Sequence, residues 1–367
     1  MCAAEVVVRV LELGPGETIV FQENYRLSTN PILEYELVPG SADYATIISS
    51  AGLRDREFED DKPDDTFRIA FVGDSVTFGL GFAPNVVFCK QLEGFLNSCA
   101  TSPEIRFEVL NFGVTGYNIP QVVEQLRTRG TRFTPDLVIY GYVLNDAQSY
   151  SVERASLEQM HAEALGQSSA ALPEFAQSML SRSQLYRLSE EAWATPTQEP
   201  DLMWMDPTAD AFRANSYQEY FTALHSAAPT WERVVRGFSD LASISEETGV
   251  PVAIAIFPIH PKDRREHYPL QSIHDQVAKL AATHNFPCLD LVDAFDAARG
   301  SGYRVLFIDP LHLDAEGHVV AALALLDWID RSGLAGTLLD ATELSSAADI
   351  LSYQALATWG RLRRGQR

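Results

Sequence analysis

Long apolar runs are absent from this 367-residue sequence. No stretch approaches the roughly 20 apolar residues that a membrane-spanning helix needs, so we expect no membrane span. The first residues, Met1–Glu5, also lack the basic and apolar segments of a signal peptide. With no targeting segment, we expect a cytoplasmic protein by default.

Basic residues are scarce. The chain has 28 Lys and Arg against 50 Asp and Glu, a net charge of −22 at pH 7. Such a field repels nucleic acids and other polyanions. We therefore expect no nucleic-acid partner, and a small-molecule substrate that is neutral or cationic.

Cysteine is rare, and its four positions show no metal-ligand spacing. No group of His, Asp and Glu has the spacing of a metal site either. We expect no metal and no other cofactor, and we interpret the cysteines as free thiols, most of them buried.

What the sequence does contain is a regular alternation of apolar strands and amphipathic helices. Strands are predicted at 67–73, 107–112, 136–143, 251–257 and 288–292, with helices around 85–98, 119–129, 270–284 and 315–329. This alternation is typical of a parallel sheet with helices on both faces, so we predict a three-layer α/β/α fold. A hydrophobic content of 46% is enough to bury such a core.

Three segments lie outside this alternation. Residues 1–60 contain short strand-like runs and predict a β-rich N-terminal extension. The main domain covers 61–335 and is interrupted at about 149–249 by a helical insertion, which its position suggests as a lid. Residues 336–367 predict a helical C-terminal tail.

The first predicted strand of the main domain ends abruptly at Gly73-Asp74-Ser75. A serine at a strand-to-helix junction has an accessible hydroxyl and an N–H group without an intrahelical partner. It can therefore act as a nucleophile and contribute to an oxyanion hole. On this segment alone, a polar cap of an ordinary turn explains the residues equally well.

Polar residues near the other strand ends favour the catalytic interpretation. Asp309 precedes His312 by three residues, a spacing that lets a carboxylate orient an imidazole. Asn111–Gly116 and Asn145-Asp146 follow two further strands. Because ligands collect at the carboxyl ends of parallel strands, we expect these four segments to meet at one edge of the sheet.

Two other enzyme folds do not fit these residues. The nucleophile elbow of α/β-hydrolases needs a glycine two residues after the serine, where this chain has Thr77. A phosphate-binding P-loop needs Gly-Lys followed by Ser or Thr, and no such sequence follows Gly73.

The four segments together resemble the sequence blocks of the SGNH (GDSL-type) hydrolase superfamily, from about Phe67 to Trp328. The resemblance implies a flavodoxin-like fold and a serine esterase without a cofactor. It assigns Ser75 as the nucleophile, His312 as the general base and Asp309 as the residue that orients it.

The resemblance also implies an oxyanion hole made by the N–H groups of Ser75 and Gly116 and the side-chain amide of Asn145. One position departs from the family pattern, because Val143 stands where a glycine usually precedes the asparagine by two residues. His260 follows the strand that ends near Phe257 and is a candidate substrate contact.

The expected reaction is hydrolysis of an acyl or acetyl ester of a small molecule or carbohydrate. Transfer of the acyl group to a sugar or alcohol uses the same residues and stays open as an alternative. A non-catalytic binding module is the third interpretation, but it has no need for the combination of Ser75, Asn145, Asp309 and His312. Envelope members of the superfamily often carry an upstream anchor, so a cell-envelope location is the alternative to the cytoplasm.

Overall fold

The computed structural model describes residues 24–42, 46–149, 151, 153–158, 216–259, 268–300 and 306–339. His260, most of the predicted insertion, the first 23 residues and nearly all of the predicted C-terminal tail lie outside the described residues.

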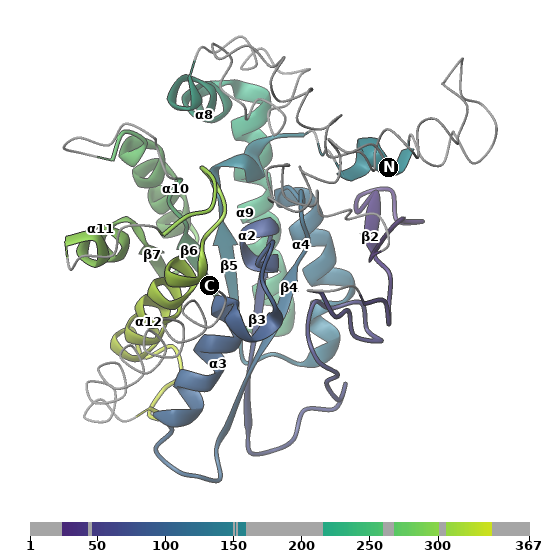
Figure 1. The fold of residues 1–367 in the computed structure, drawn as a ribbon, viewed down its shortest axis with the longest axis vertical. Helices are drawn as coiled ribbons and strands as arrows, with labels where there is room; N and C mark the ends of the chain where they lie inside the picture. Colours follow the sequence, from purple (N-terminus) through teal and green to yellow (C-terminus); the bar gives the residue numbers. More distant parts are fainter. Residues whose placement is uncertain are drawn as a thin grey trace, which may run out of the picture.

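A five-stranded parallel sheet with the strand order β4-β3-β5-β6-β7 forms the centre of the molecule (Figure 1). Its strands are β3 (Thr66–Gly73), β4 (Arg106–Gly113), β5 (Leu137–Tyr142), β6 (Val252–Ile256) and β7 (Cys288–Asp290). All residues of β5 and β6 are buried, as expected for strands that are covered on both faces.

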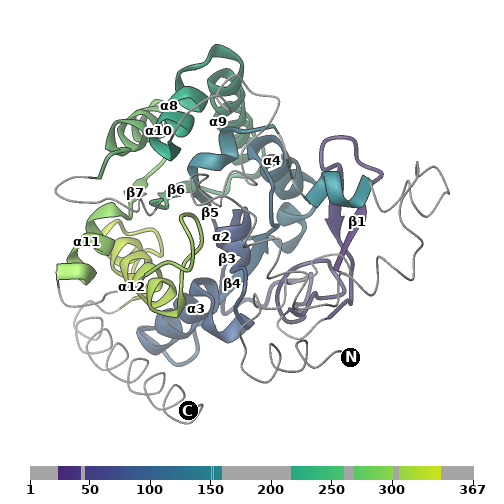
Figure 2. The same ribbon diagram turned by 45° about the horizontal axis from the view of Figure 1, so that its top comes forward.

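Helices cover both faces of this sheet, and the predicted three-layer α/β/α fold is confirmed (Figure 2). One layer contains α3 (Phe88–Ser98), α11 (Val292–Gly300) and α12 (Ala315–Arg331). The other contains α4 (Ile119–Thr128), α8 (Tyr217–Ser226), α9 (Ala228–Thr248) and α10 (Gln271–Thr283). Short helical turns complete the fold: α2 (Ser75–Phe78), η2 (Pro84–Val86), η3 (Gly130–Phe133) and η4 (Leu144–Ala147).

Side-chain caps define where several of these helices begin. The Asn118 side chain accepts a hydrogen bond from the N–H of Gln121, whose own side chain accepts one from the N–H of Asn118. At the start of α12, the Asp314 side chain accepts a hydrogen bond from the N–H of Gly317. The second cap places the segment with Asp309 and His312 directly before a firmly anchored helix.

The last part of the predicted insertion, about 149–249, contains helix α9. Helix α9 packs against α4 and β6 and leads the chain from β5 to β6, so it belongs to the α/β/α layers. Its buried stripe includes Val234, Phe238 and Leu241. Such a stripe is common to layer helices and inserted helices, and periodicity alone cannot separate the two.

In the N-terminal extension, β1 (Tyr25–Leu27) pairs antiparallel with β2 (Tyr35–Leu37). The rings of Tyr35 and Tyr117 lie edge to face with centroids 5.2 Å apart, and Tyr25 contacts the ring of Phe78. This hairpin therefore packs against the segments that follow β3 and β4.

Candidate active site

Ser75 is the first residue of α2 and directly follows the carboxyl end of β3. Asp74 caps this short helix, since its Oδ1 accepts a hydrogen bond from the N–H of Val76 at 2.9 Å. Only 4% of Ser75 is exposed. Among the described residues, no backbone carbonyl accepts a hydrogen bond from its N–H, as expected at the first position of a helix.

A close approach between α2 and β4 holds this turn in place. A Cβ atom added to Gly113 would lie 2.1 Å from the backbone nitrogen of Phe78, so only glycine leaves room for α2. The Asn111 side chain donates a hydrogen bond to the carbonyl of Thr77 at 2.9 Å and accepts one from the N–H of Gly113 at 2.8 Å. Asn111 thus joins β4 to the helix that carries Ser75.

Ser75, His312 and Asp309 form one continuous hydrogen-bonded chain. The distance from His312 Nε2 to Ser75 Oγ is 2.8 Å, and the distance from His312 Nδ1 to Asp309 Oδ2 is 2.6 Å. Because an ionised carboxylate only accepts hydrogen bonds, Nδ1 carries the proton of a neutral imidazole. Nε2 then accepts the hydrogen bond of the Ser75 hydroxyl.

Asp309 is suited to remain ionised. Burial by itself raises the pKa of this carboxyl group, but the hydrogen bond and charge of His312 outweigh burial and lower it. The backbone N–H groups of Leu311 and His312 each donate to Asp309 Oδ1 at 2.8 Å. These three donors fix the carboxylate against the imidazole.

Gly116 lies on the loop that follows β4 and lines the same cavity as Ser75. Its φ of +74° is in the left-handed region, which favours glycine. No carbonyl among the described residues accepts a hydrogen bond from its N–H. The residues predicted as oxyanion donors, Ser75 and Gly116, are therefore brought together, and neither N–H group donates to a backbone carbonyl within the part of the chain that the structure describes.

Asn145 reaches the same cavity from η4, the turn after β5. Its Nδ2 donates a hydrogen bond to Asp74 Oδ2 at 2.9 Å, and the second hydrogen of this amide is left for a ligand. Val143, the departure from the family pattern, has extended backbone angles of φ −119° and ψ 150°. Any residue adopts these angles, so the loop does not require a glycine there.

Asp146 supports the turn that carries Asn145. Its Oδ2 accepts hydrogen bonds from the Tyr140 hydroxyl at 2.6 Å and the Val143 N–H at 3.2 Å. Complete burial raises the pKa of Asp146 well above its ordinary value.

The space around Ser75 is small, with a volume of about 20 Å³. Its walls are formed by residues from four segments of the chain: Ser75, Thr115, Gly116, Asn145, Gln148, Ser151, Glu153 and Leu311. A volume of this size holds little more than one water molecule. The cavity therefore has room for only the smallest chemical groups beside the serine.

The sequence analysis missed Glu153, whose side chain lines this cavity. A Cβ atom added to Gly116 would lie 2.0 Å from Glu153 Oε2, which shows how closely the carboxyl group covers this glycine. Burial raises the pKa of Glu153 above its ordinary value. The only sequence signal was its position eight residues after Asn145, too weak to single out one acid among 50.

Of the other histidines, His318 lies inside α12 and is 1% exposed. Its Nδ1 accepts a hydrogen bond from the N–H of Phe88 at 3.3 Å, and burial lowers its pKa to about 3. Its ring packs against Phe82 and Phe88 as a neutral core residue. The predicted contact of His260 with substrate lies outside the described residues.

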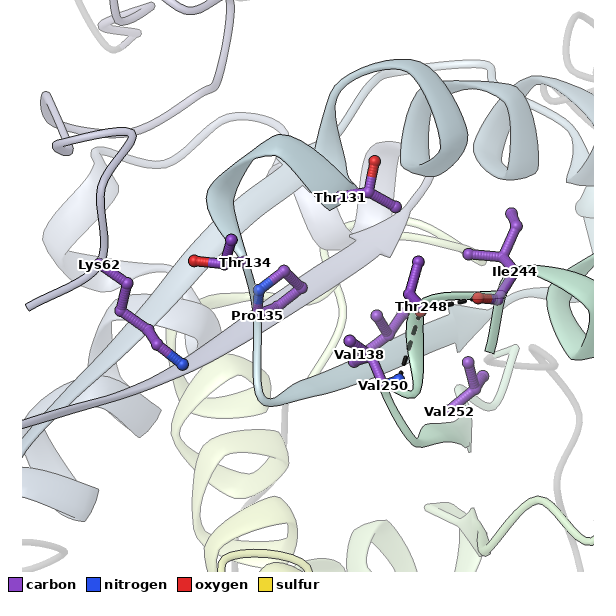
Figure 3. Close-up of a pocket in the computed structure, with 9 residues that line it drawn as sticks. All are labelled: Lys62, Thr131, Thr134, Pro135, Val138, Ile244, Thr248, Val250 and Val252. Atoms are coloured by element: carbon purple, nitrogen blue, oxygen red, sulfur yellow. Dashed lines mark hydrogen bonds between the residues drawn. The ribbon is translucent and has the colours of Figure 1, made fainter. Parts of the chain in front are cut away.

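A larger cavity of about 310 Å³ lies at the opposite, amino-terminal edge of the sheet (Figure 3). Most of its lining is apolar or threonine: Lys62, Thr131, Thr134, Pro135, Val138, Ile244, Thr248, Val250 and Val252. Its one ionisable lining residue, Lys62, pairs with Asp136. Nothing in this lining provides a nucleophile with a base.

Within the described ranges, no cluster of three or more His, Cys, Asp and Glu residues has the geometry to hold a metal ion. In the same part of the chain, no helix combines the length and the apolar composition that crossing a bilayer requires.

Solved structures of several hydrolases resemble this chain distantly. LAE5, an α/β hydrolase enzyme from the metagenome of Lake Arreo in Spain, is 15% identical with a TM-score of 0.43; the match covers 72% of this chain and 95% of LAE5. A two-domain esterase active on acetylated mannans is 13% identical with a TM-score of 0.41, over 72% of this chain and 49% of that one. A mutant of Axe2, an acetyl-xylooligosaccharide esterase from Geobacillus, is 17% identical with a TM-score of 0.40; the match covers 72% of this chain and 94% of that one.

The search of curated proteins found no match to this chain. The model of the GDSL-like lipase/acylhydrolase family, in contrast, matches residues 71–320, which is most of the chain and includes every segment that meets at Ser75. The chain therefore belongs to the GDSL-like lipase/acylhydrolase family and is a serine hydrolase that acts on ester bonds.

Proposed function

We propose that this protein hydrolyses short-chain carboxylic esters through an acyl-enzyme intermediate on Ser75. The hydrogen-bonded chain from Asp309 through His312 to Ser75, with links of 2.6 and 2.8 Å, is the observation that carries this proposal. It has the connectivity that converts a serine hydroxyl into a nucleophile.

In the first half of the reaction, Ser75 Oγ attacks the ester carbonyl carbon while His312 Nε2 takes the hydroxyl proton. The carbonyl oxygen becomes an oxyanion, which the N–H groups of Ser75 and Gly116 and the second amide hydrogen of Asn145 stabilise. Collapse of this intermediate breaks the bond to the alcohol, and the imidazolium returns the proton to the departing oxygen.

Water completes the reaction. His312 removes a proton from a water molecule, whose oxygen attacks the acyl carbon, and the serine leaves with that proton. Asp309 stays ionised throughout and stabilises the imidazolium that forms in each half-reaction.

The small volume beside Ser75 supports short acyl groups, the acetyl group above all. About 20 Å³ of free space next to the nucleophile leaves no room for a long acyl chain without movement of its walls. The alcohol part of the ester, a small molecule or carbohydrate, then extends away from this cavity.

The first test combines active-site labelling with turnover. A fluorophosphonate probe should modify Ser75 alone, and Ser75→Ala should lose labelling together with about 10⁴-fold or more of ester turnover. Ser98→Ala removes a hydroxyl on α3 that only contacts the Gly94 carbonyl, so it should behave like the wild type. A labelled peptide without Ser75, or full turnover by Ser75→Ala, would contradict the proposal.

The same ester assay also measures which acyl length is preferred and which molecule accepts the acyl group. Acetyl esters should be hydrolysed at a higher kcat/KM than octanoyl esters of the same alcohol. Reactions with and without added sugar or alcohol separate hydrolysis from acyl transfer, because the two differ only in what attacks the acyl-enzyme.

A further inference from the structure

A row of three hydrogen bonds connects Glu153 to the loop that carries Gly116. Glu153 Oε2 lies 2.9 Å from Ser151 Oγ, which lies 2.9 Å from the hydroxyl oxygen of Tyr35. The Tyr35 hydroxyl in turn lies 2.7 Å from the carbonyl oxygen of Thr115. We call these four residues the Glu153 relay.

Counting protons determines the ionisation state that this relay needs. Each of its three contacts requires one proton, and the Thr115 carbonyl can only accept. Tyr35 donates to Thr115, so Ser151 must donate to Tyr35. Ser151 has a single hydroxyl proton, which it can give to Tyr35 or to Glu153 but not to both. All three hydrogen bonds therefore form together only when the Glu153 carboxyl group is protonated and donates to Ser151.

The surroundings of Glu153 agree with a neutral acid. Its neighbouring cation, Arg154, turns away and pairs with Glu34 and Glu158. Among the described residues, the titratable or charged groups around the relay include Tyr25, Tyr35, Tyr117, Asp74, His312 and Arg154. Burial is the largest effect on the pKa of Glu153 and raises it, and the charge of Asp74 adds to this rise. Hydrogen bonds from its own backbone N–H and from Ser151, and the charge of His312, oppose burial without cancelling it.

The relay ends on the peptide unit that supplies an oxyanion donor. The Thr115 carbonyl and the Gly116 N–H belong to the same planar peptide, so a hydrogen bond to the carbonyl fixes the direction of the N–H. It also polarises the peptide, which makes the N–H a stronger donor. An ionised Glu153 would break this relay and place a negative charge directly over Gly116, where the oxyanion forms.

We propose that Glu153, as a neutral acid, is a positioning residue that acts through Ser151 and Tyr35 to aim the Gly116 N–H at the oxyanion. Ionisation of Glu153 therefore switches the site to a less active form. This inference rests on the proposed function, because it assigns Gly116 as an oxyanion donor for the reaction at Ser75.

The test is the pH dependence of ester hydrolysis by the wild type and Glu153→Gln. Because a neutral Glu153 is needed, kcat of the wild type should fall as pH rises through the pKa of this group. The glutamine amide donates to Ser151 at every pH, so Glu153→Gln should lose this fall. On the alkaline side its kcat should exceed that of the wild type by about tenfold, with KM little changed.

Two tyrosine variants test the link to Gly116. Tyr35→Phe removes the donor to Thr115 and should lower kcat about tenfold at acidic and neutral pH without changing KM. Tyr117→Phe removes a buried hydroxyl of the same cluster, which donates to the Tyr35 backbone carbonyl at 2.6 Å and stands outside the relay. It should retain the pH profile of the wild type.

An alkaline fall of equal size in Glu153→Gln and the wild type would overturn the relay, as would full kcat in Tyr35→Phe. Labelling of Ser75 by the fluorophosphonate probe separates this failure from a failure of the proposed function. If Ser75 is labelled and required for turnover, only the relay is wrong; if it is not, the assignment of the site itself is wrong.

Discussion

Asn145 combines a structural contact with the catalytic role that we propose for it. One hydrogen of its amide goes to Asp74, which is fully buried and caps α2. The other is available to a ligand in the cavity beside Ser75. A single side chain thus joins the turn after β5 to the turn after β3 and also lines the cavity beside Ser75.

Replacing this residue should therefore change two properties. Asn145→Ala should lower kcat about 100-fold or more and leave KM little changed, because the amide acts on charge that develops in the transition state. It should also lower the free energy of unfolding by about 1–3 kcal/mol, since Asp74 loses a hydrogen bond in a buried site. Kinetics and urea unfolding of the one variant measure both effects.

A variant that loses stability but keeps its kcat would make Asn145 a turn residue only. Full stability with reduced kcat would show that its bond to Asp74 contributes little to folding.

Among the secondary-structure elements, the contact between α2 and β4 determines where the serine lies. Gly113→Ala would place a methyl group against the backbone of Phe78, which cannot move without moving α2. We expect a loss of about 1–3 kcal/mol in the free energy of unfolding, as in other overpacked cores, and a lower kcat because Ser75 shifts. Thermal unfolding and ester turnover check the two effects.

Gly94→Ala on α3 is the matched control. A Cβ atom there meets nothing within 4 Å, and alanine favours a helix interior by about 0.5–1 kcal/mol. This variant should gain stability and retain wild-type turnover. If both alanine variants lost stability equally, the close approach of α2 to β4 would not be the cause.

The N-terminal hairpin is a second element with an unexpected role. Tyr35 on β2 donates a hydrogen bond to the Thr115 carbonyl, and Tyr117 donates one back to the Tyr35 carbonyl. The family match begins only at residue 71, yet this hairpin lies against a loop of the candidate site. The extension is therefore part of the environment of the active site.

For the molecule as a whole, burial of acidic groups couples folding to pH. Asp146 is buried with its pKa raised, so the folded protein binds its proton more tightly than the unfolded chain. Protonated Asp146 therefore contributes to the free energy of unfolding at low pH. This contribution is lost as pH rises from about 4, the ordinary pKa of an aspartate, toward the pKa that Asp146 has in the folded protein. The contribution of Asp309 depends on pH in the opposite direction. Its pKa is lowered by folding, so the stability that it provides is lost as pH falls.

Asp146→Asn isolates this contribution, because asparagine does not titrate and Asp309 is unchanged. Relative to the wild type, the variant should gain about 1 kcal/mol or more between about pH 5 and about pH 8. Urea unfolding of both proteins at several pH values measures this difference. Parallel curves for the two proteins would mean that folding does not change the pKa of Asp146.

Patterns within short segments were sufficient to predict much of this protein. The strand at 67–73 and the helix that starts at Ala315 follow from local periodicity, and the structure has them as β3 and α12. The grouping of Ser75, Asn145, Asp309 and His312 at one sheet edge follows from a rule of parallel sheets. Local sequence does not predict the burial of Asp55, because this residue lies in a charge-rich segment that is typical of an exposed loop. In the structure Asp55 is 1% exposed and accepts a hydrogen bond from the N–H of Asn111.

By itself, then, the sequence determined the order of the elements and predicted the residues that we propose as the triad, because helix and strand periods and the Asp309–His312 spacing are local properties of the chain. Only the tertiary structure decided that Tyr35, Ser151 and Glu153 meet the loop of Gly116. Tyr35 and Ser151 are separated by 116 positions in the sequence, and no periodicity connects them. Their contact depends on how the hairpin packs against the sheet, which arises from burial of the whole core.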